Sequence, residues 1–312
     1  MFRGICGYYS GVISEMPLLN FSKCKNISSI FYQAQAIKKL PMYDFSNVEE
    51  ASSAFYRMSS IDTSVNYYAI FSNMPNLKSA RNFLQWTPFK IEGEALHFPK
   101  MLDPAWMFNC INITSLPKIY FSEDCTQLYF TFKQAEQLTG TLHFPQILSN
   151  QNKGLACCGA FEECYKIEEI IFDYIYVSDG LDMFYKDSKL KLIKTLDLRY
   201  CNRTSKMFFS CTALETLIIK YLNYSLSVKN CANLTLETLI GLCKECVKSE
   251  IAKTLSINSA CLEKLSTVYV KLTDKTEDNE SYPKLPCAVC ESTDEGAMLI
   301  SDYMALKNWT LA

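Results

Sequence analysis

Apolar residues recur along this chain at a fixed local spacing. In the clearest copy, Phe208 is followed by Cys211 three residues later and by Leu214 six residues later. The same order of an aromatic, a small or sulfur-containing and an aliphatic residue occurs, with one polar exception, in six further triplets: Phe31, Ala34, Ile37; Phe55, Met58, Ile61; Phe71, Met74, Leu77; Phe132, Ala135, Leu138; Phe161, Cys164, Ile167; and Phe184, Asp187, Leu190. Two imperfect copies are Phe108 with Cys110, and Phe2 with Ile5. Such repetition predicts a solenoid, in which each unit buries its apolar face against its neighbours.

A second pattern, a pair of apolar residues two positions apart, follows most of the triplets. The pairs are Leu19/Phe21, Tyr43/Phe45, Leu96/Phe98, Ile119/Phe121, Leu142/Phe144, Ile170/Phe172, Leu196/Leu198 and Leu217/Ile219. Short alternation of this kind is typical of a strand with one buried face. We therefore expect one strand per unit, stacked into a parallel sheet whose outward residues meet solvent. The stretch 78–94 does not fit and is interpreted as an insertion.

The pattern ends after Cys231, and a different one follows. Apolar residues at helical spacing, with Thr235 as N-cap, predict a helix over 236–247. We then expect a strand at 254–257, a helix around Cys261 and Leu265, an exposed loop at 273–281 and a strand at 285–290. A capping box at 292–295 predicts a last helix that runs to Trp309.

These patterns divide the chain into two regions. Residues 1–232 are expected to form a solenoid of about nine units, and residues 233–312 a helix-strand cap that shields the last core face. The chain begins inside a copy of the triplet, at Met1 and Phe2, so we expect a truncated N-terminus.

The residues of 183–190 and 207–214, supported by 160–164 and 44–48, resemble the BspA-type leucine-rich repeats of bacterial surface proteins, some protist surface proteins and phage-encoded proteins. The ending at 300–312 resembles the end of such arrays in phage and prophage structural proteins of gut bacteria. The resemblance covers residue 1 to about 232. It implies an α/β fold, a leucine-rich-repeat solenoid with stacked parallel strands and a C-terminal α/β capping segment. It carries over no catalytic residue and implies binding to a surface or to another protein.

Composition excludes some classes of function. The chain has 31 basic and 33 acidic residues and shows no basic cluster, which argues against a nucleic-acid partner. No run of 18 apolar residues predicts a membrane span, and the first residues lack the pattern of a secretory signal. The hydrophobic fraction of 49% is enough for a continuous core.

Fifteen cysteines are many for one chain, and their number is odd. A chain that can build its own core does not need a disulfide framework, so we expect mostly reduced, packed thiols and folding in a reducing cytoplasm. Two CxxC pairs leave a zinc site or a redox role open as alternatives, and their residues are Cys243, Cys246, Cys287 and Cys290. Because 40 residues separate the pairs, packed thiols are the favoured interpretation.

The two histidines, His97 and His143, occur in the same phrase, Leu-His-Phe-Pro. They are interpreted as outward strand residues, with a shared metal or a pH-sensitive contact as the alternative. The sequence has no Gly-x-Ser-x-Gly, His-Glu-x-x-His or phosphate-cradling glycine loop. We therefore expect neither enzymatic activity nor a cofactor.

The outward residues of the predicted sheet are the best candidates for ligand contact. They are Tyr43, Asp44, His97, Tyr120, His143, Asp197, Arg199 and Lys220. Tyrosine, histidine and mixed charges on a rigid surface suit recognition of a protein or glycan. The sequence predicts a non-catalytic binding module in a virion-associated protein, such as a phage tail component, or in a bacterial surface protein. The alternative is a structural spacer or assembly platform that contacts neighbouring proteins in a larger complex.

Overall fold

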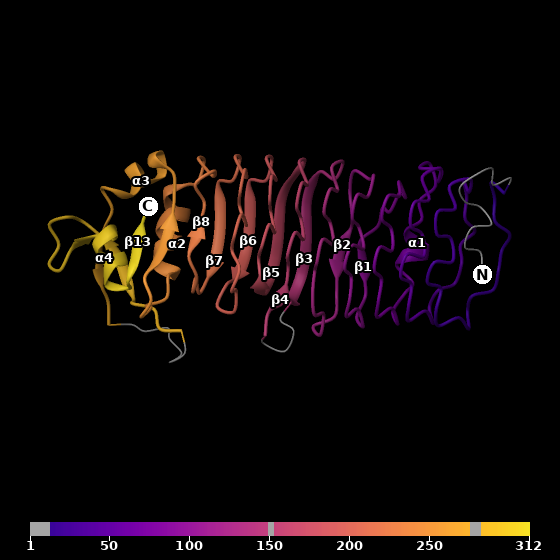
Figure 1. Ribbon diagram of the computed structural model, residues 1–312, viewed down its shortest axis with the longest axis horizontal. Coiled ribbons are helices and arrows are strands. Elements are labelled where there is room, and N and C mark those ends of the chain that lie inside the picture. Colours follow the sequence, from indigo (N-terminus) through magenta and orange to yellow (C-terminus); the bar gives the residue numbers. More distant parts are fainter. Residues whose placement is uncertain (1–12, 149–152, 275–281) are drawn as a thin grey trace.

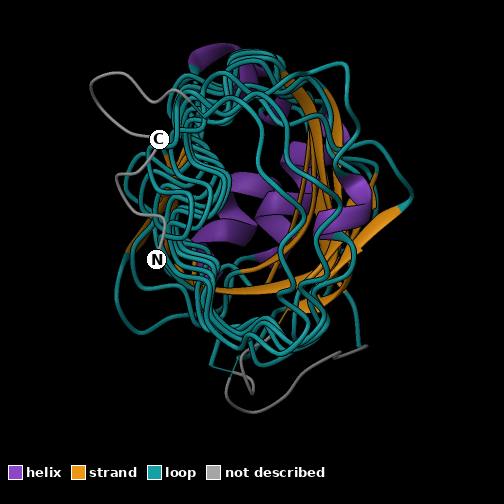
Figure 2. Ribbon diagram, turned by 90° about the vertical axis from the view of Figure 1, so that its right-hand side faces the viewer, coloured by secondary structure: helices purple, strands orange, loops and turns teal. Residues whose placement is uncertain are grey.

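The computed structural model describes residues 13–148, 153–274 and 282–312. The chain is a β-solenoid whose coils stack along one long axis, from the N-terminal to the C-terminal end (Figure 1). Seen along this axis, most of the strands lie on one side of the cross-section and stacked loops make up much of the rest (Figure 2). The stacked parallel strands are confirmed. The α/β character is not, because the helices are short and few within the described residues.

The strands on this side pair in parallel with the next coil. The strands are β1 (Ala95–His97), β2 (Lys118–Tyr120), β3 (Gly140–Leu148), β4 (Leu155–Ala156), β5 (Ile167–Asp179), β6 (Leu192–Asp197) and β7 (Thr216–Lys220). β1 pairs with β2, and β3, β5, β6 and β7 form one sheet in that order, with β4 beside β5. The pairs predicted at 19–21 and 43–45 form no strand, although single bridges such as Glu15 with Lys39 join these coils.

Each coil also contains a compact eight-residue segment, here called the phenylalanine run. The runs are 27–34, 51–58, 80–87, 104–111, 128–135, 157–164, 180–187 and 204–211. The fifth residue of each run is buried in the core, and these residues are Phe31, Phe55, Leu84, Phe108, Phe132, Phe161, Phe184 and Phe208. The rings stack from coil to coil: Phe161 lies 5.3 Å from Phe132 and 5.5 Å from Phe184, nearly parallel to both. The predicted stack of phenylalanines is therefore confirmed.

The runs share an unusual backbone. The third and seventh residues of every run have positive φ, and they are Ser29, Gln33, Ser53, Arg57, Asn82, Trp86, Trp106, Cys110, Phe130, Gln134, Gly159, Glu163, Asp182, Lys186, Lys206 and Ser210. Only one is glycine, although a left-handed conformation costs other residues roughly 1–2 kcal/mol. The turns aim alternate N–H groups at the next coil. Ser29, Phe31 and Gln33, for example, donate to carbonyls 2.9, 2.9 and 2.7 Å away on the following run.

Two details of the predicted pattern are wrong. Phe71 belongs to helix α1 (Tyr68–Phe71), which stands where a neighbouring coil has its strand. The neighbouring coil has its phenylalanine run at 80–87, inside the segment interpreted as an insertion. This run was missed because Leu84 replaces the central phenylalanine. In the run 104–111, Ile111 fills the buried eighth position, and Cys110 lies outside the core. Phe2 and Ile5 lie outside the described residues.

The C-terminal region continues the stack. β8 (Leu226–Ser227), β9 (Lys253–Ser256) and β13 (Trp309–Leu311) pair in parallel in the order β8, β9, β13. Helix α2 (Leu236–Glu245) packs against β7, and the Thr235 hydroxyl accepts the Thr238 N–H, which confirms the predicted N-cap. The other elements are α3 (Ser259–Leu265), β10 (Tyr269–Leu272), β11 (Cys287–Cys290), β12 (Met298–Leu299) and α4 (Ile300–Leu306).

The last predicted helix is wrong in its limits. Residues 292–296 form turns, α4 begins only at Ile300, and Trp309 belongs to β13. Strand pairing is the reason, because Trp309 pairs with Lys253 on β9 and its indole N–H donates to Val247 O at 2.8 Å. Most of the loop predicted at 273–281 lies outside the described residues.

One run carries an ionisable residue in the core. The eighth residues of the last three runs are Cys164, Asp187 and Cys211, and all three are fully buried. One Asp187 oxygen accepts the Cys164 N–H at 2.8 Å, and the other has no hydrogen-bond partner among the described residues. Burial holds the pKa of the Asp187 carboxyl well above its ordinary value, opposed by the Cys164 hydrogen bond. The folded protein therefore keeps this group neutral where the unfolded chain ionises it.

Truncation of a stacked ring tests the core. Phe161→Ala removes a fully buried ring that stacks on two others, and we expect it to lower the free energy of unfolding by about 3–5 kcal/mol. Phe209→Ala is the matched control because that ring is 42% exposed. Urea unfolding of both variants measures the difference. An unchanged transition for Phe161→Ala would contradict the stacked core.

The pH dependence of stability tests Asp187. Well below the ordinary Asp pKa of about 3.9 the carboxyl is neutral in both states, so it costs nothing. As the pH rises towards its raised folded pKa, only the unfolded chain ionises, and stability falls by up to about 1.4 kcal/mol per pH unit. Asp187→Asn keeps the acceptor for Cys164 and removes this loss. We therefore expect the variant to gain stability over the wild type between pH 4 and pH 7 in urea unfolding. A difference that does not change with pH would show that Asp187 is not held neutral.

Candidate functional site

The strands place one outward side chain from each of six coils in a row, exposed at His97, Lys194 and Ile218 and half-buried at the other three. Strand pairing sets His97 beside Tyr120, His143 beside Ile171, Ile171 beside Lys194 and Lys194 beside Ile218. Beneath the row, the rings of Phe98, Phe121, Phe144 and Phe172 stack at 6.2, 6.3 and 5.1 Å, so Tyr120 and His143 also occupy adjacent coils. We call this the outer row; its members are His97, Tyr120, His143, Ile171, Lys194 and Ile218.

The outer row holds its side chains in fixed positions. The His97 ring stacks on Tyr120 at 4.3 Å and 10°, and the His143 ring lies 3.1 Å from an Asp173 oxygen. Neighbouring coils are about 4.8 Å apart, the usual spacing between paired strands. Tyr120 separates the two imidazoles, so the row does not bring His97 and His143 to one metal ion.

Two predicted face residues lie at the N-terminal end, and only one is exposed. Tyr43 is buried against Phe21 and Phe45, and its hydroxyl donates to Pro17 O at 2.9 Å. Burial raises the pKa of Tyr43 to about 12. Tyr43 is therefore a core residue, contrary to prediction. Asp44 is exposed, and its oxygen accepts the Ser46 N–H at 2.9 Å, as in a turn.

Asp197 is also buried, because β6 shifts its register between Lys194 and Leu196. The shift puts Lys194, which was not predicted, into the outer row. Asp197 instead accepts a two-pronged contact from Arg199, at 2.7–3.0 Å, and the Tyr174 hydroxyl at 2.6 Å. Burial, together with the bond to Asp197, raises the pKa of the Tyr174 phenol. The prediction that Asp197 faces a ligand is wrong.

Arg199 and Lys220 are occupied by partners within the protein. The Arg199 guanidinium lies 3.9 Å from the centre of the Tyr221 ring and 5.3 Å from that of Tyr176. Lys220 lies 3.6 Å from Glu245. A cation over an aromatic face or beside a carboxylate already has a favourable electrostatic partner within the protein. These residues form a rigid edge to the strand face rather than an open charged site.

The CxxC residues lie at the C-terminal end and are all free thiols. Cys243 and Cys246 are buried; burial raises the pKa of Cys243 to about 12 and that of Cys246 well above its ordinary value. Because zinc binds the thiolate, this burial disfavours the zinc alternative. Within the described ranges, no group of three histidine, cysteine or acidic residues could hold a metal ion.

A buried lysine lies beside these thiols. The Lys307 ammonium donates to Cys243 O at 3.1 Å and to Lys244 O at 3.0 Å, near the C-terminal end of α2. Burial lowers the pKa of Lys307 to about 8. A cation at the negative end of a helix stabilises its last carbonyls. The arrangement is thus a helix cap that joins α4 to α2.

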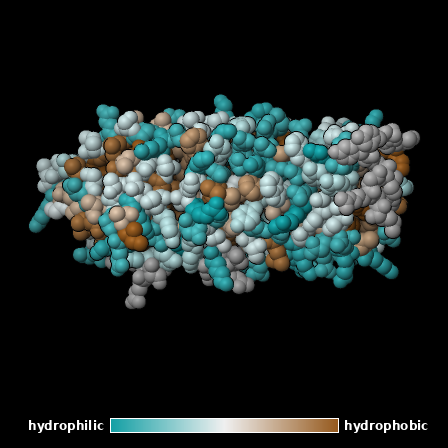
Figure 3. All heavy atoms as spheres, in the orientation of Figure 1, coloured by the Kyte–Doolittle hydropathy of each residue, from teal (hydrophilic) through white to brown (hydrophobic). Residues whose placement is uncertain are grey.

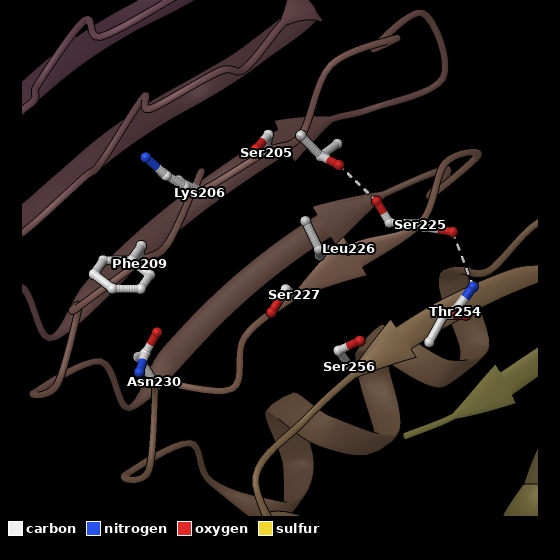
Figure 4. Close-up of a pocket in the computed structure, with 10 residues that line it drawn as sticks. Ser205, Lys206, Phe209, Ser225, Leu226, Ser227, Asn230, Thr254 and Ser256 are labelled. Atoms are coloured by element: carbon white, nitrogen blue, oxygen red, sulfur yellow. Dashed lines mark hydrogen bonds between the residues drawn. The ribbon is translucent and has the colours of Figure 1, made fainter.

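Sequence reasoning missed a groove where the last run meets β8 and β9 (Figure 4). We call it the step groove; its volume is 340 Å³ and its lining residues are Thr204, Ser205, Lys206, Phe209, Ser225, Leu226, Ser227, Asn230, Thr254 and Ser256. The available signal was the alternation of hydroxyl and leucine residues in 225–227 and 254–256.

On the face drawn in Figure 3, hydrophobic residues form small separate patches among hydrophilic ones. No helix in the described part of the chain has the length and apolar character needed to cross a lipid bilayer. Comparison with known proteins yields no matching family model, no matching curated protein and no matching solved structure.

Proposed function

We propose that this chain is a non-catalytic binding module that recognises a macromolecule, a protein or a glycan, on its strand face. The outer row is the observation that carries the proposal. Its aromatic, imidazole, aliphatic and lysine side chains lie on a rigid ladder of paired strands. A surface that is already ordered loses little conformational entropy when it binds.

The shape of the surface supports a large ligand. The outer row is an extended line along the stack, whereas small molecules are usually enclosed in concave pockets. Tyrosine and other aromatic side chains contribute strongly to recognition of macromolecules. Tyr120 and His97 provide such a stacked pair on the strand face.

We also propose kinship with BspA-type leucine-rich repeats and a place in a phage tail-associated or bacterial surface protein. The repeated triplets and the parallel strand stack support this kinship. The cysteines in the described ranges are free thiols, which suits folding in a reducing cytoplasm before assembly into a virion.

A structural spacer is the second candidate. In its favour, several polar side chains of the strand face already have partners within the protein, such as His143 with Asp173 and Arg199 with Asp197. A spacer would use the same rigid stack to hold neighbouring proteins apart, with no need for an exposed receptor site.

Removal of the outer row tests the proposal. We expect the wild type to bind at least one member of a glycan array or whole bacterial cells. A triple variant, His97→Ala with His143→Ala and Ile218→Asp, should weaken this binding at least about tenfold, or about 1.4 kcal/mol. The ligand contacts are lost while the buried ladder is kept, so thermal unfolding should change little.

Lys38→Ala, at an exposed position outside the row, is the matched control and should bind as the wild type does. A triple variant that binds as tightly as the wild type would refute the assignment to the strand face. A wild type that binds neither glycans nor cells would favour the spacer.

A further inference from the structure

The step groove exists because the solenoid changes its backbone at this point. In the last run, Lys206 and Ser210 have positive φ, as the equivalent residues of the earlier runs do. In the next coil the equivalent segment is the extended strand β8. β9, from the coil after that, pairs with β8 in parallel. The surface therefore steps down from the run to two flat strands. Figure 4 shows Lys206 and Phe209 on one side of the hollow, with Asn230 below Phe209, Thr254 and Ser256 on the other side, and Ser227 between the two sides.

The floor of the groove consists of hydroxyl groups. Leu226 and Leu255 point into the core, so the residues that alternate with them point outward. These outward residues are Ser225, Ser227, Thr254 and Ser256. The Ser225 hydroxyl already accepts the Thr254 N–H at 2.9 Å. Because a hydroxyl can donate one hydrogen bond and accept two, the floor can still match either role in a ligand.

One wall carries an aromatic ring. Phe209 is 42% exposed, and its ring is held by stacking on Tyr185 at 5.5 Å. Asn230 adds an amide at the end of the floor, and Lys206 is the one charged residue among those that line the groove. An exposed apolar ring beside neutral donors and acceptors suits a ligand with both a C–H face and hydroxyl groups.

A second hollow of 410 Å³ adjoins the first, and the two share Thr204 and Ser225. It contains another exposed ring, Tyr224, and the amides of Asn202 and Asn223. Its lysine, Lys253, donates to Asn223 Oδ1 at 2.8 Å and lies over the Tyr224 ring. The two hollows thus repeat one arrangement: an exposed aromatic ring beside neutral hydroxyls and amides.

We propose that the step groove and the adjoining hollow bind a neutral oligosaccharide, with sugar rings against Phe209 and Tyr224 and sugar hydroxyls on the serine and threonine floor. An acidic ligand would find only Lys206 and the occupied Lys253. A peptide could not add as a strand beside β9, because β9 is paired on both edges, with β8 and β13, and beside β8 the Thr204 hydroxyl already donates to Ser225 O at 2.6 Å. The site lies apart from the outer row and goes beyond the function proposed for that row.

The test uses the full folded chain and a panel of neutral hexasaccharides of glucose and of N-acetylglucosamine, with sulfated hexasaccharides as the acidic arm. Isothermal titration should give saturable binding of at least one neutral member, with a Kd of roughly 1 mM or lower. Phe209→Ala should weaken it at least about tenfold, and Ser256→Val at least about fivefold. Valine suits a strand, so Ser256→Val tests the floor without loss of the fold.

Tyr56→Ala is the matched control, because Tyr56 occupies the same position in its run as Phe209 does but lies on a distant coil. It should bind as the wild type does, and so should the triple variant of the outer row. The proposal is overturned if no neutral member binds at 10 mM, roughly ten times the expected Kd. Binding of sulfated members alone, or unchanged binding by Phe209→Ala and Ser256→Val, also overturns it. Loss of binding in the outer-row variant would place the sugar on the strand face instead.

Discussion

The contact between one coil and the next is the constraint on which the rest of the molecule depends. Alternate N–H groups of the phenylalanine runs from 27–34 to 180–187 donate to the following run, and most of the central residues are stacked rings. A left-handed residue costs roughly 1–2 kcal/mol, and most runs carry two that are not glycine. The ladder and the ring contacts must offset this cost. No run is expected to hold its shape alone, because the inter-coil hydrogen bonds and the ring contacts come from its neighbours.

The repeat, the parallel strands and the Thr235 cap could be predicted because they rest on local spacing. The residues with positive φ could not be predicted, because residue types such as Trp106 and Phe130 rarely adopt this conformation and the sequence carries no signal for it. The outer row was predicted only in part. His97, Tyr120 and His143 alternate regularly, whereas the register shift in β6 exchanges Asp197 for Lys194. Tyr43 fits the alternation but is buried by neighbouring rings that sequence alone does not place.

The same ladder produces two surfaces of different character. Where strands repeat without interruption, it gives the outer row, an extended line of mixed side chains. Where the runs give way to β8 and β9, it leaves a groove floored by hydroxyls. Both surfaces are set by the backbone rather than by flexible loops, so binding at either one would require little reorganisation. The residues that stack explain why the chain folds, and those that vary between coils are where recognition is proposed.

Amide hydrogen exchange, resolved by residue in the run 51–58, tests the coil-to-coil ladder most directly. Ser53, Phe55 and Arg57 donate to the next coil, at 2.7, 3.1 and 2.9 Å, whereas Tyr56 makes only a 3.4 Å bond within its own turn. We expect the first three amides to exchange only when the stack unfolds, and Tyr56 to exchange faster through local opening. Equally fast exchange at all four positions would contradict the ladder.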